Sequence, residues 1–262
     1  MTSPRGALGA KPSPLPKSRL DQLLVARGLA QSRERARALL LAGHVDVNGV
    51  RVTKAGTLVD DAAAITMQQP DHPWVGRGGI KLAHALDAFH LDVTGLTALD
   101  IGASTGGFTD VLLQRGAARV VALDVGHNQL DWRLRSDPRV VCLEGVNARY
   151  LRAEDLPAGV SPFALIVMDV SFISLAQILP VIPPLLAPDG RVIALVKPQF
   201  EAGRDDVGPG GIVRDPAIHE RVIQQVTAAA VQVGLERLRL EPSPVTGAEG
   251  NREFLLLLRR RP

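Results

Sequence analysis

The fold class can be recognised from one stretch of the sequence, Leu99-Asp100-Ile101-Gly102-Ala103-Ser104-Thr105-Gly106-Gly107-Phe108-Thr109-Asp110. It reads as a short apolar strand, a glycine-rich loop and the beginning of a helix. Glycines in such a loop let the backbone approach a ligand closely and let the helix start against the strand. Because ligands of open α/β sheets bind at the carboxyl ends of the strands, this loop predicts a binding site.

On both sides of this loop, short apolar strands alternate with helical segments. The predicted strands are Thr97–Asp100, Arg119–Asp124, Arg139–Glu144, Phe163–Asp169, Arg191–Lys197, Leu235–Leu240 and Phe254–Arg259, and the predicted helices are Phe108–Arg115, Leu175–Leu186 and Pro216–Val233. This alternation predicts an α/β fold with a mainly parallel sheet of seven strands and helices on both faces. No helix separates the last two strands, so we expect an antiparallel hairpin at one edge.

An acidic residue follows the glycine loop at a distance typical of nucleotide sites. Asp124 ends the second strand, 22 residues after Gly102, where a carboxylate can accept hydrogen bonds from both ribose hydroxyls of an adenine nucleotide. The dinucleotide fingerprint of nicotinamide enzymes requires a glycine at position 104, and this chain has Ser104. A nicotinamide site is therefore disfavoured, and it remains an alternative together with a purely structural glycine turn.

The loop, with the pattern D-x-G-x-x-x-G-G, resembles the S-adenosylmethionine loop of class I methyltransferases. That resemblance implies a Rossmann-like fold and S-adenosylmethionine as cofactor, with adenine near the end of the third strand. The residues expected to bind the cofactor are Asp100, Gly102, Ser104, Thr105, Gly106, Gly107, Phe108, Asp124, Asn147 and Asp169.

Four ionisable residues lie where this topology brings chain ends together. Asp169 and Lys197 end the fourth and fifth strands, Lys81 lies just before the sheet, and Glu253 opens the last strand. Taken singly, each has an ordinary explanation as an ion pair or a solvated strand end. Together they resemble the K-D-K-E tetrad of FtsJ-type ribose 2′-O-methyltransferases, which implies that they are catalytic.

The reaction implied by this resemblance explains the residue types. A ribose hydroxyl is a poor nucleophile, and positioning it in line with the methyl group can supply roughly 7–11 kcal/mol. Lys197 would act as a base, or as an ammonium that orients the hydroxyl and stabilises the developing alkoxide. Asp169 would orient Lys197, while Lys81 and Glu253 would fix the ribose and its phosphate.

The first part of the chain is basic. Residues 1–81 hold 12 Lys and Arg against 6 Asp and Glu, whereas the remainder holds 18 against 21. Such asymmetry indicates a basic module attached to a different domain. We expect a helix from Leu20, a second helix from about Arg33 to Ala42 that follows Ser32, a hairpin turn at Asn48-Gly49, and another strand over Ala62 to Met67.

This order of helix, basic helix and V-D-V-N-G hairpin resembles an S4 RNA-binding domain, a small α+β fold, and implies structured RNA as a partner. The residues expected to bind RNA are Arg19, Arg33, Arg35, Arg37, Lys54 and Arg77. Basic helices contact phosphates without needing aromatic stacking, which suits a chain with one Tyr, two Trp and six Phe.

Over residues 18–260 the chain resembles the TlyA (hemolysin A) family of ribosomal RNA 2′-O-methyltransferases. The most specific motifs are R-G-G-x-K-L, M-D-V-S-F-I-S-L, L-V-K-P-Q-F-E and G-N-x-E-F. The resemblance implies ribosomal RNA or ribosomal subunits as substrate and cytidine as the target nucleoside. We expect a disordered tail over 1–17, the S4 domain over 18–69, a linker over 70–77 and the FtsJ-like domain over 78–262.

Several absences limit the remaining function classes. The single cysteine, Cys142, cannot form an internal disulfide, and the six histidines show no metal-ligand spacing, so we expect no metal. No apolar run or leader segment indicates a membrane or an export signal, so we expect a cytoplasmic protein. A non-catalytic RNA-binding assembly factor and a hemolysin-like protein remain alternatives. The glycine-containing segment Gln199–Asp215 predicts a lid over the substrate.

Overall fold

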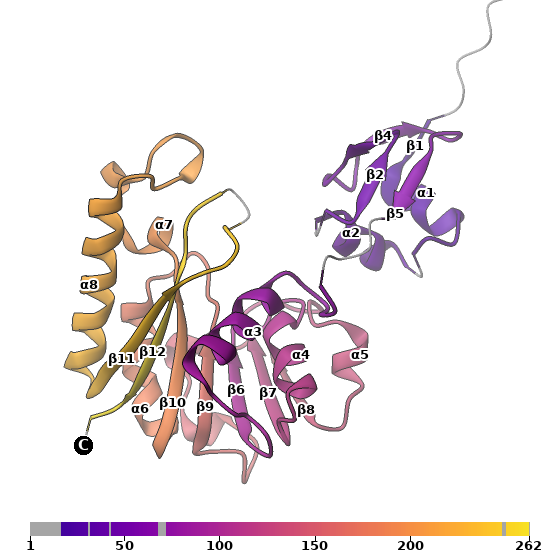
Figure 1. Cartoon of the computed structure of the whole chain (residues 1–262). Helices are drawn as coiled ribbons and strands as arrows, with labels where there is room; N and C mark the ends of the chain where they lie inside the picture. The colour runs from indigo at the N-terminus through magenta and orange to yellow at the C-terminus, as the bar shows by residue number, and fades with distance from the viewer. Residues whose placement is uncertain (1–16, 31, 42, 68–71, 248–249, 262) are drawn as a thin grey trace, which may run out of the picture. The chain divides into compact units, whose positions relative to one another are not determined.

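The computed structural model describes residues 17–30, 32–41, 43–67, 72–247 and 250–261. The chain divides into two compact units, residues 1–71 and residues 72–262 (Figure 1). The predicted tail lies outside the described residues except for Lys17, where the prediction is wrong because Lys17 pairs with Asp60 in a strand. Ala42 and the linker residues 70–71 also lie outside the described residues.

The N-terminal unit packs two helices against two small antiparallel sheets. Its elements are β1 (Lys17–Arg19), α1 (Leu20–Ala26), α2 (Arg33–Leu41), β2 (Val45–Val47), β3 (Val50–Arg51), β4 (Leu58–Asp60) and β5 (Ile65–Met67). The strands pair as β1-β4 and β3-β2-β5. Asn48 and Gly49 have φ angles of 50° and 79°, so the hairpin turn is the predicted one.

The strands of this unit are shorter than the sequence indicates. The strand predicted from Ala62 begins only at Ile65, because the backbone N–H of Ala63 closes a turn onto Asp60. β1 and β4 were not predicted, since three residues are too few to show an alternating pattern.

The C-terminal unit contains the predicted seven-stranded sheet. Its strands are β6 (Thr97–Ile101), β7 (Arg119–Asp124), β8 (Val140–Glu144), β9 (Phe163–Met168), β10 (Leu186–Val196), β11 (Leu235–Pro242) and β12 (Phe254–Arg260), in the order β11-β12-β10-β9-β6-β7-β8. From β10 to β8 neighbouring strands are parallel, and β12 runs antiparallel to both β10 and β11. The edge hairpin is therefore confirmed.

Helices cover both faces of this sheet. α3 (Gly78–Phe89) and α4 (Gly107–Gln114) share one buried core with strand residues such as Ala98, and α8 (Pro216–Gln232) shares the other with residues such as Leu99. Successive strand residues alternate between these cores because strand side chains point to opposite faces. Figure 1 shows α3 in front of the sheet and α8 beside β11. We did not predict α3, which carries Lys81.

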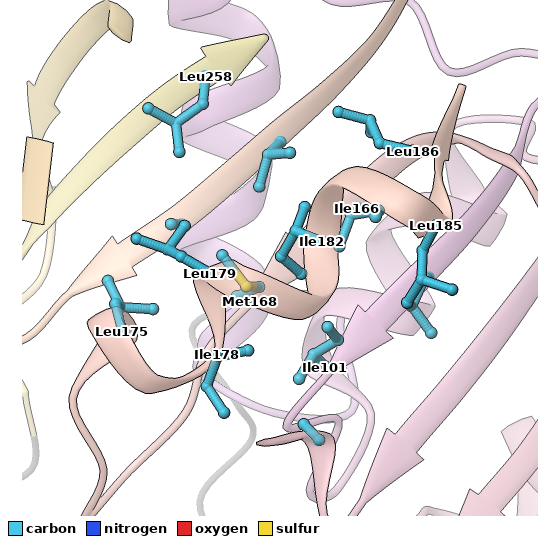
Figure 2. Close-up of a cluster of buried hydrophobic side chains, with 14 of the residues drawn as sticks. Ile101, Ile166, Met168, Leu175, Ile178, Leu179, Ile182, Leu185, Leu186 and Leu258 are labelled. Carbon is cyan, nitrogen blue, oxygen red and sulfur yellow. The ribbon is translucent and has the colours of Figure 1, made fainter. Parts of the chain in front are cut away.

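The helix predicted over Leu175–Leu186 is wrong. The segment forms the 3₁₀ turns η3 (Leu175–Gln177) and η4 (Leu179–Val181) and the short helix α6 (Ile182–Leu185), and Leu186 already begins β10. Prolines stand in the first turns of η4 and α6, where a missing N–H is tolerated, and they interrupt a continuous helix. The apolar side chains still pack on the sheet, as Figure 2 shows for Ile178 and Ile182 beside Ile101 and Met168.

Candidate active site

The loop between β6 and α4 lies against the end of β9. A Cβ atom on Gly102 would lie 2.5 Å from the backbone oxygen of Asp169, and the φ of Gly102 is +84°. Gly106 has φ +98°, and a Cβ there would collide with the side chain of Leu134. Both positions therefore need glycine for the close approach of backbone to its neighbours.

Asp100, near the end of β6, connects this strand to α4. Its side chain is fully buried and accepts a hydrogen bond of 2.7 Å from Thr109 Oγ1 on α4. Burial raises the pKa of this carboxyl to about 7, while the hydrogen bond from Thr109 opposes the shift. Asp100 thus contributes to the site by joining the strand to the helix across the loop.

Two adjoining cavities lie beside the loop. One, of about 210 Å³, is lined by Gly78, Gly102, Ala103, Ser104, Thr105, Gly107, Phe108, Asp169, Ser171 and Lys197. The other, of about 430 Å³, is lined by Ile101, Gly102, Ser104, Leu123, Asp124, Val125, Gln129, Val146, Asn147, Ala148, Asp169, Val170, Ser171, Phe172, Ile173 and Ile178. All residues expected to bind the cofactor line one of these cavities except Asp100 and Gly106.

Asp124 is held at the rim of the larger cavity by backbone amides. Its Oδ2 accepts a hydrogen bond from the Ser104 N–H at 2.8 Å, and its Oδ1 accepts one from the Gly126 N–H at 2.7 Å. A carboxylate has about four lone-pair positions, so two hydrogen bonds leave room for two hydroxyl donors. This geometry suits a ribose diol.

Lys197 is buried at the end of β10 and has two oxygen partners. Its Nζ lies 2.5 Å from Asp169 Oδ1 and donates to Ser171 Oγ at 2.9 Å. The side chain of Lys197 is 11% exposed and that of Asp169 is 19% exposed. The Phe200 ring centroid is 5.9 Å from Nζ. The lysine is thus fixed by partners within the lining of the smaller cavity.

Lys81 and Glu253 form the second buried pair. Lys81 Nζ on α3 donates to Glu253 Oε2 at 2.5 Å, although the two residues are 172 positions apart in the sequence. A Cβ atom on Gly247 would lie 2.6 Å from Glu253 Oε1, so the turn before β12 packs directly on this carboxylate. Buried ions of this kind are tolerated because they are paired.

The strand register brings the two pairs to one edge of the sheet. Val196 pairs with Phe254, so Lys197 and Glu253 occupy the next position of the same ladder. Ala194 pairs with Met168, one residue before Asp169. A Cβ atom on Gly78, one turn before Lys81, would lie 3.7 Å from Asp169 Oδ2. The four predicted residues therefore converge at the carboxyl end of the central strands.

In the N-terminal unit, three of the arginines expected to bind RNA surround one carboxylate. Asp21 is fully buried and pairs with Arg19 at 3.1 Å, Arg33 at 3.2 Å and Arg37 at 3.5 Å. The hydrogen bond from Arg19 is the main cause that holds the pKa of Asp21 well below its usual range. The three arginine side chains remain about half exposed. Arg35 also lies on α2, and Lys54 is exposed; Arg77 is exposed too, but it belongs to the C-terminal unit.

The segment predicted as a lid is partly structured and anchored. It contains α7 (Pro198–Glu201) and the 3₁₀ turns η5 (Arg204–Asp206) and η6 (Pro209–Gly211). Buried Asn251 accepts from the Val213 N–H at 2.9 Å and donates to the Gly211 oxygen at 2.8 Å. These bonds fix the far end of the segment beside Glu253, so closure over a substrate stays a prediction for the residues before Gly211.

Known families match both units of the chain. Residues 74–260 match the FtsJ-like methyltransferase family, and residues 18–65 match the S4 domain. A 16S/23S rRNA (cytidine-2′-O)-methyltransferase, TlyA of Mycobacterium tuberculosis, is 48% identical over 93% of this chain and 90% of that protein. The chain belongs to the TlyA (hemolysin A) family.

Two further members support this assignment to the TlyA family. Hemolysin A of Brachyspira hyodysenteriae is 43% identical over 90% of this chain and 98% of that protein. A solved structure from Streptococcus thermophilus, described as a candidate hemolysin, superposes with a TM-score of 0.73 and 46% identity, covering 94% of this chain and 90% of that one. In the described part of the present chain, no helix has the length and apolar character needed to cross a membrane.

Sequence reasoning missed three residues that support the site, of which Ser171 and Phe200 contact Lys197 and Asn251 anchors the segment before Val213. Ser171, Phe200 and Asn251 stand inside motifs that we quoted, but a single sequence gives no pattern that separates them from their neighbours. The sequence feature that could have indicated Ser171 is its position two residues after Asp169, just past the carboxyl end of the fourth predicted strand. Contact with Lys197 becomes visible only when β9 and β10 are placed side by side.

Proposed function

We propose that this TlyA-family chain transfers a methyl group from S-adenosylmethionine to a ribose 2′-hydroxyl of ribosomal RNA, with cytidine as the target nucleoside, in the cytoplasm. The observation that carries the proposal is the Lys197–Asp169 pair in the lining of the smaller cavity, together with the buried Lys81–Glu253 pair at the same edge of the sheet. The sequence identity of 48% to a relative named as a cytidine-2′-O-methyltransferase supports cytidine as the target nucleoside.

The lining of the two cavities fits S-adenosylmethionine. Asp124 would accept hydrogen bonds from the ribose hydroxyls, and Asn147 and Ile178 would border the adenine in the larger cavity. Thr105, Phe108 and the loop backbone would border the amino-acid part in the smaller cavity. When bound, the cofactor supplies an electrophilic methyl group on a positively charged sulfur. Asp169 lines both cavities and is therefore close to where the two parts join.

The tetrad residues would prepare the ribose hydroxyl for attack. Lys197, held by Asp169 and Ser171, would donate a hydrogen bond to the 2′-oxygen and stabilise the negative charge that develops there as the hydroxyl proton passes to solvent water. Lys81 and Glu253, rigid because they are paired and buried, would hold the ribose and its neighbouring phosphate. Positioning of this kind can supply a large part of the rate enhancement.

The N-terminal unit would bind the RNA backbone. The three arginines around Asp21 carry more positive charge than one carboxylate neutralises, and their half-exposed guanidinium groups suit phosphate oxygens. Three or four such contacts predict a log–log salt slope of about −3 for binding.

Transfer of tritiated methyl groups from S-adenosylmethionine to purified ribosomal subunits tests the proposal. We expect alkali-resistant label in the RNA with the native protein and a rate of labelling at least about 100-fold lower with Lys197→Ala. Label in neither subunit, from protein that still binds the cofactor, would instead favour a non-catalytic RNA-binding factor.

A further inference from the structure

We propose that Ser171 is a positioning residue of the methyl-transfer reaction, which fixes the direction in which the Lys197 ammonium presents its remaining hydrogens to the substrate. This inference rests on the proposed function, because it assumes that Lys197 acts on the ribose hydroxyl. Ser171 lines both cavities, and its Oγ is 2.9 Å from Lys197 Nζ.

The hydrogen-bond count at Lys197 carries the inference. An ammonium has three N–H donors. Ser171 Oγ accepts one of them at 2.9 Å, whereas Asp169 Oδ1, 2.5 Å from Nζ, is an ion-pair partner. The three N–H groups can turn together about the Cε–Nζ bond, and the ion pair with Asp169 alone does not fix that rotation. The hydrogen bond to Ser171 fixes the rotation and thereby the directions of the other two N–H groups, which are left for an incoming oxygen.

The other lysine of the tetrad lacks this arrangement. Within the described residues, Lys81 Nζ has Glu253 as its hydrogen-bonded carboxylate, and no hydroxyl group holds a second hydrogen. The hydroxyl acceptor is thus found at the lysine that lines the smaller cavity, where direction matters for the reaction.

The loop that carries Ser171 is held in an unusual conformation. Phe172 has φ +64°, in the left-handed region that bulky residues rarely adopt. Two contacts with α7 hold it there: the Phe172 and Phe200 rings lie 5.0 Å apart, and Glu201 accepts from Ser174 Oγ at 2.6 Å and the Leu175 N–H at 2.7 Å. Strained backbone that its surroundings maintain is common at functional sites. Since α7 starts directly after Lys197, the same turn fixes both the lysine and the loop.

Ser171 is exposed, so it can be replaced without opening a cavity in the core. In Ser171→Ala we expect kcat to fall about 10- to 100-fold, the cost of a poorly directed reacting group, with S-adenosylmethionine affinity changed less than about threefold. Ser171→Thr keeps the hydroxyl at a site with room for a methyl group and restores kcat. The matched control is Ser136→Ala, an exposed serine outside both cavities, which leaves kcat unchanged.

A double-mutant cycle with Lys197→Ala separates this role from a general structural one. If Ser171 acts through Lys197, Ser171→Ala has no further effect on the residual rate of Lys197→Ala. Loss of activity in Lys197→Ala together with normal kcat in Ser171→Ala would overturn the positioning role alone. Equal fold-losses from Ser171→Ala in both backgrounds would also overturn it. Normal activity in Lys197→Ala would contradict the proposed function itself.

Discussion

Both units of the chain pair carboxylates with cations, but the cations of the two units differ in how far they are exposed. In the N-terminal unit, fully buried Asp21 faces three arginines whose side chains remain 42%, 46% and 51% exposed. In the C-terminal unit, Lys81 and Lys197 are themselves 11% exposed, next to Glu253 and Asp169. Exposed cations can contact phosphates of any sequence, whereas buried ones hold a fixed geometry. The first arrangement suits binding and the second suits catalysis.

The largest effect should follow from removing the cation at the cavity. We expect Lys197→Ala to lower kcat by about 10²- to 10⁴-fold, because it removes both the orienting donor and any base. Steady-state methyl transfer to ribosomal subunits measures this change. Lys17→Ala, which removes an exposed lysine at the start of β1, is the matched control and should leave kcat within about twofold. Similar losses of kcat in both variants would show that the buried lysine matters no more for catalysis than the exposed one.

Removing one member of the second buried pair should cost stability. In Glu253→Ala the Lys81 ammonium is left buried without its carboxylate, so the free energy of unfolding should fall by about 3–5 kcal/mol. Urea unfolding gives this value. Glu154→Ala breaks an ion pair with Arg152 in which both side chains are about two-thirds exposed, and it should cost at most about 1 kcal/mol. A cost for Glu253→Ala as small as that for Glu154→Ala would show that burial is unimportant.

The contribution of Asp100 to the free energy of unfolding should change with pH in the opposite direction to that of Asp21. Burial raises the pKa of Asp100 from 3.8 to about 7, so between these values the folded protein keeps a proton that the unfolded chain releases. The free energy of unfolding therefore falls as pH rises from about 4 to about 7, by of the order of 4 kcal/mol from this group.

Asp100→Asn should lack this contribution, and the difference between native and variant curves from urea unfolding at several pH values measures it. At Asp21 the arginines lower the pKa, so its contribution is present above about pH 4 and is lost as the pH falls further. Parallel curves for native protein and Asp100→Asn between pH 4 and 7 would refute the assignment for Asp100.

The smallest effect should come from one exposed arginine. Arg33→Ala should weaken binding to ribosomal RNA by about 1 kcal/mol and make the log–log salt slope less negative by about 1. Filter binding at several salt concentrations measures both quantities. Arg115→Ala, at the end of α4 away from the glycine loop, removes an equally exposed arginine that pairs with Asp87, and it should change neither. Equal slopes for Arg33→Ala and the native protein would argue against phosphate contact at α2.

The sequence alone predicts the parts of the fold that depend on local pattern. The apolar strands, the glycine loop and the Asn48-Gly49 turn each have a signal within a few residues. The helix over Leu175–Leu186 was wrong because apolar spacing outweighed Pro180 and Pro183 in our interpretation. α3 was missed because it begins with two glycines, which are weak helix formers, and its helical form depends on packing against the sheet.

The candidate site shows the same limit. The four tetrad residues could be selected because strand ends gather at one edge of a parallel sheet. Their pairing could not be predicted, since Lys81 and Glu253 meet only after the whole sheet is assembled. Asp21 shows a different limit. The sequence places it among basic residues, but only the structure shows that its carboxylate is buried.

The most direct test of the account is the identity of the modified nucleoside. Ribosomal subunits incubated with S-adenosylmethionine and the native protein, or Lys197→Ala, would be digested to nucleosides and analysed by mass spectrometry. We expect additional 2′-O-methylcytidine with the native protein and at least about 100-fold slower formation with the variant. A methyl group found on a base, or 2′-O-methylcytidine formed equally by Lys197→Ala, would contradict the assignment of the buried pairs as a ribose-methylating site.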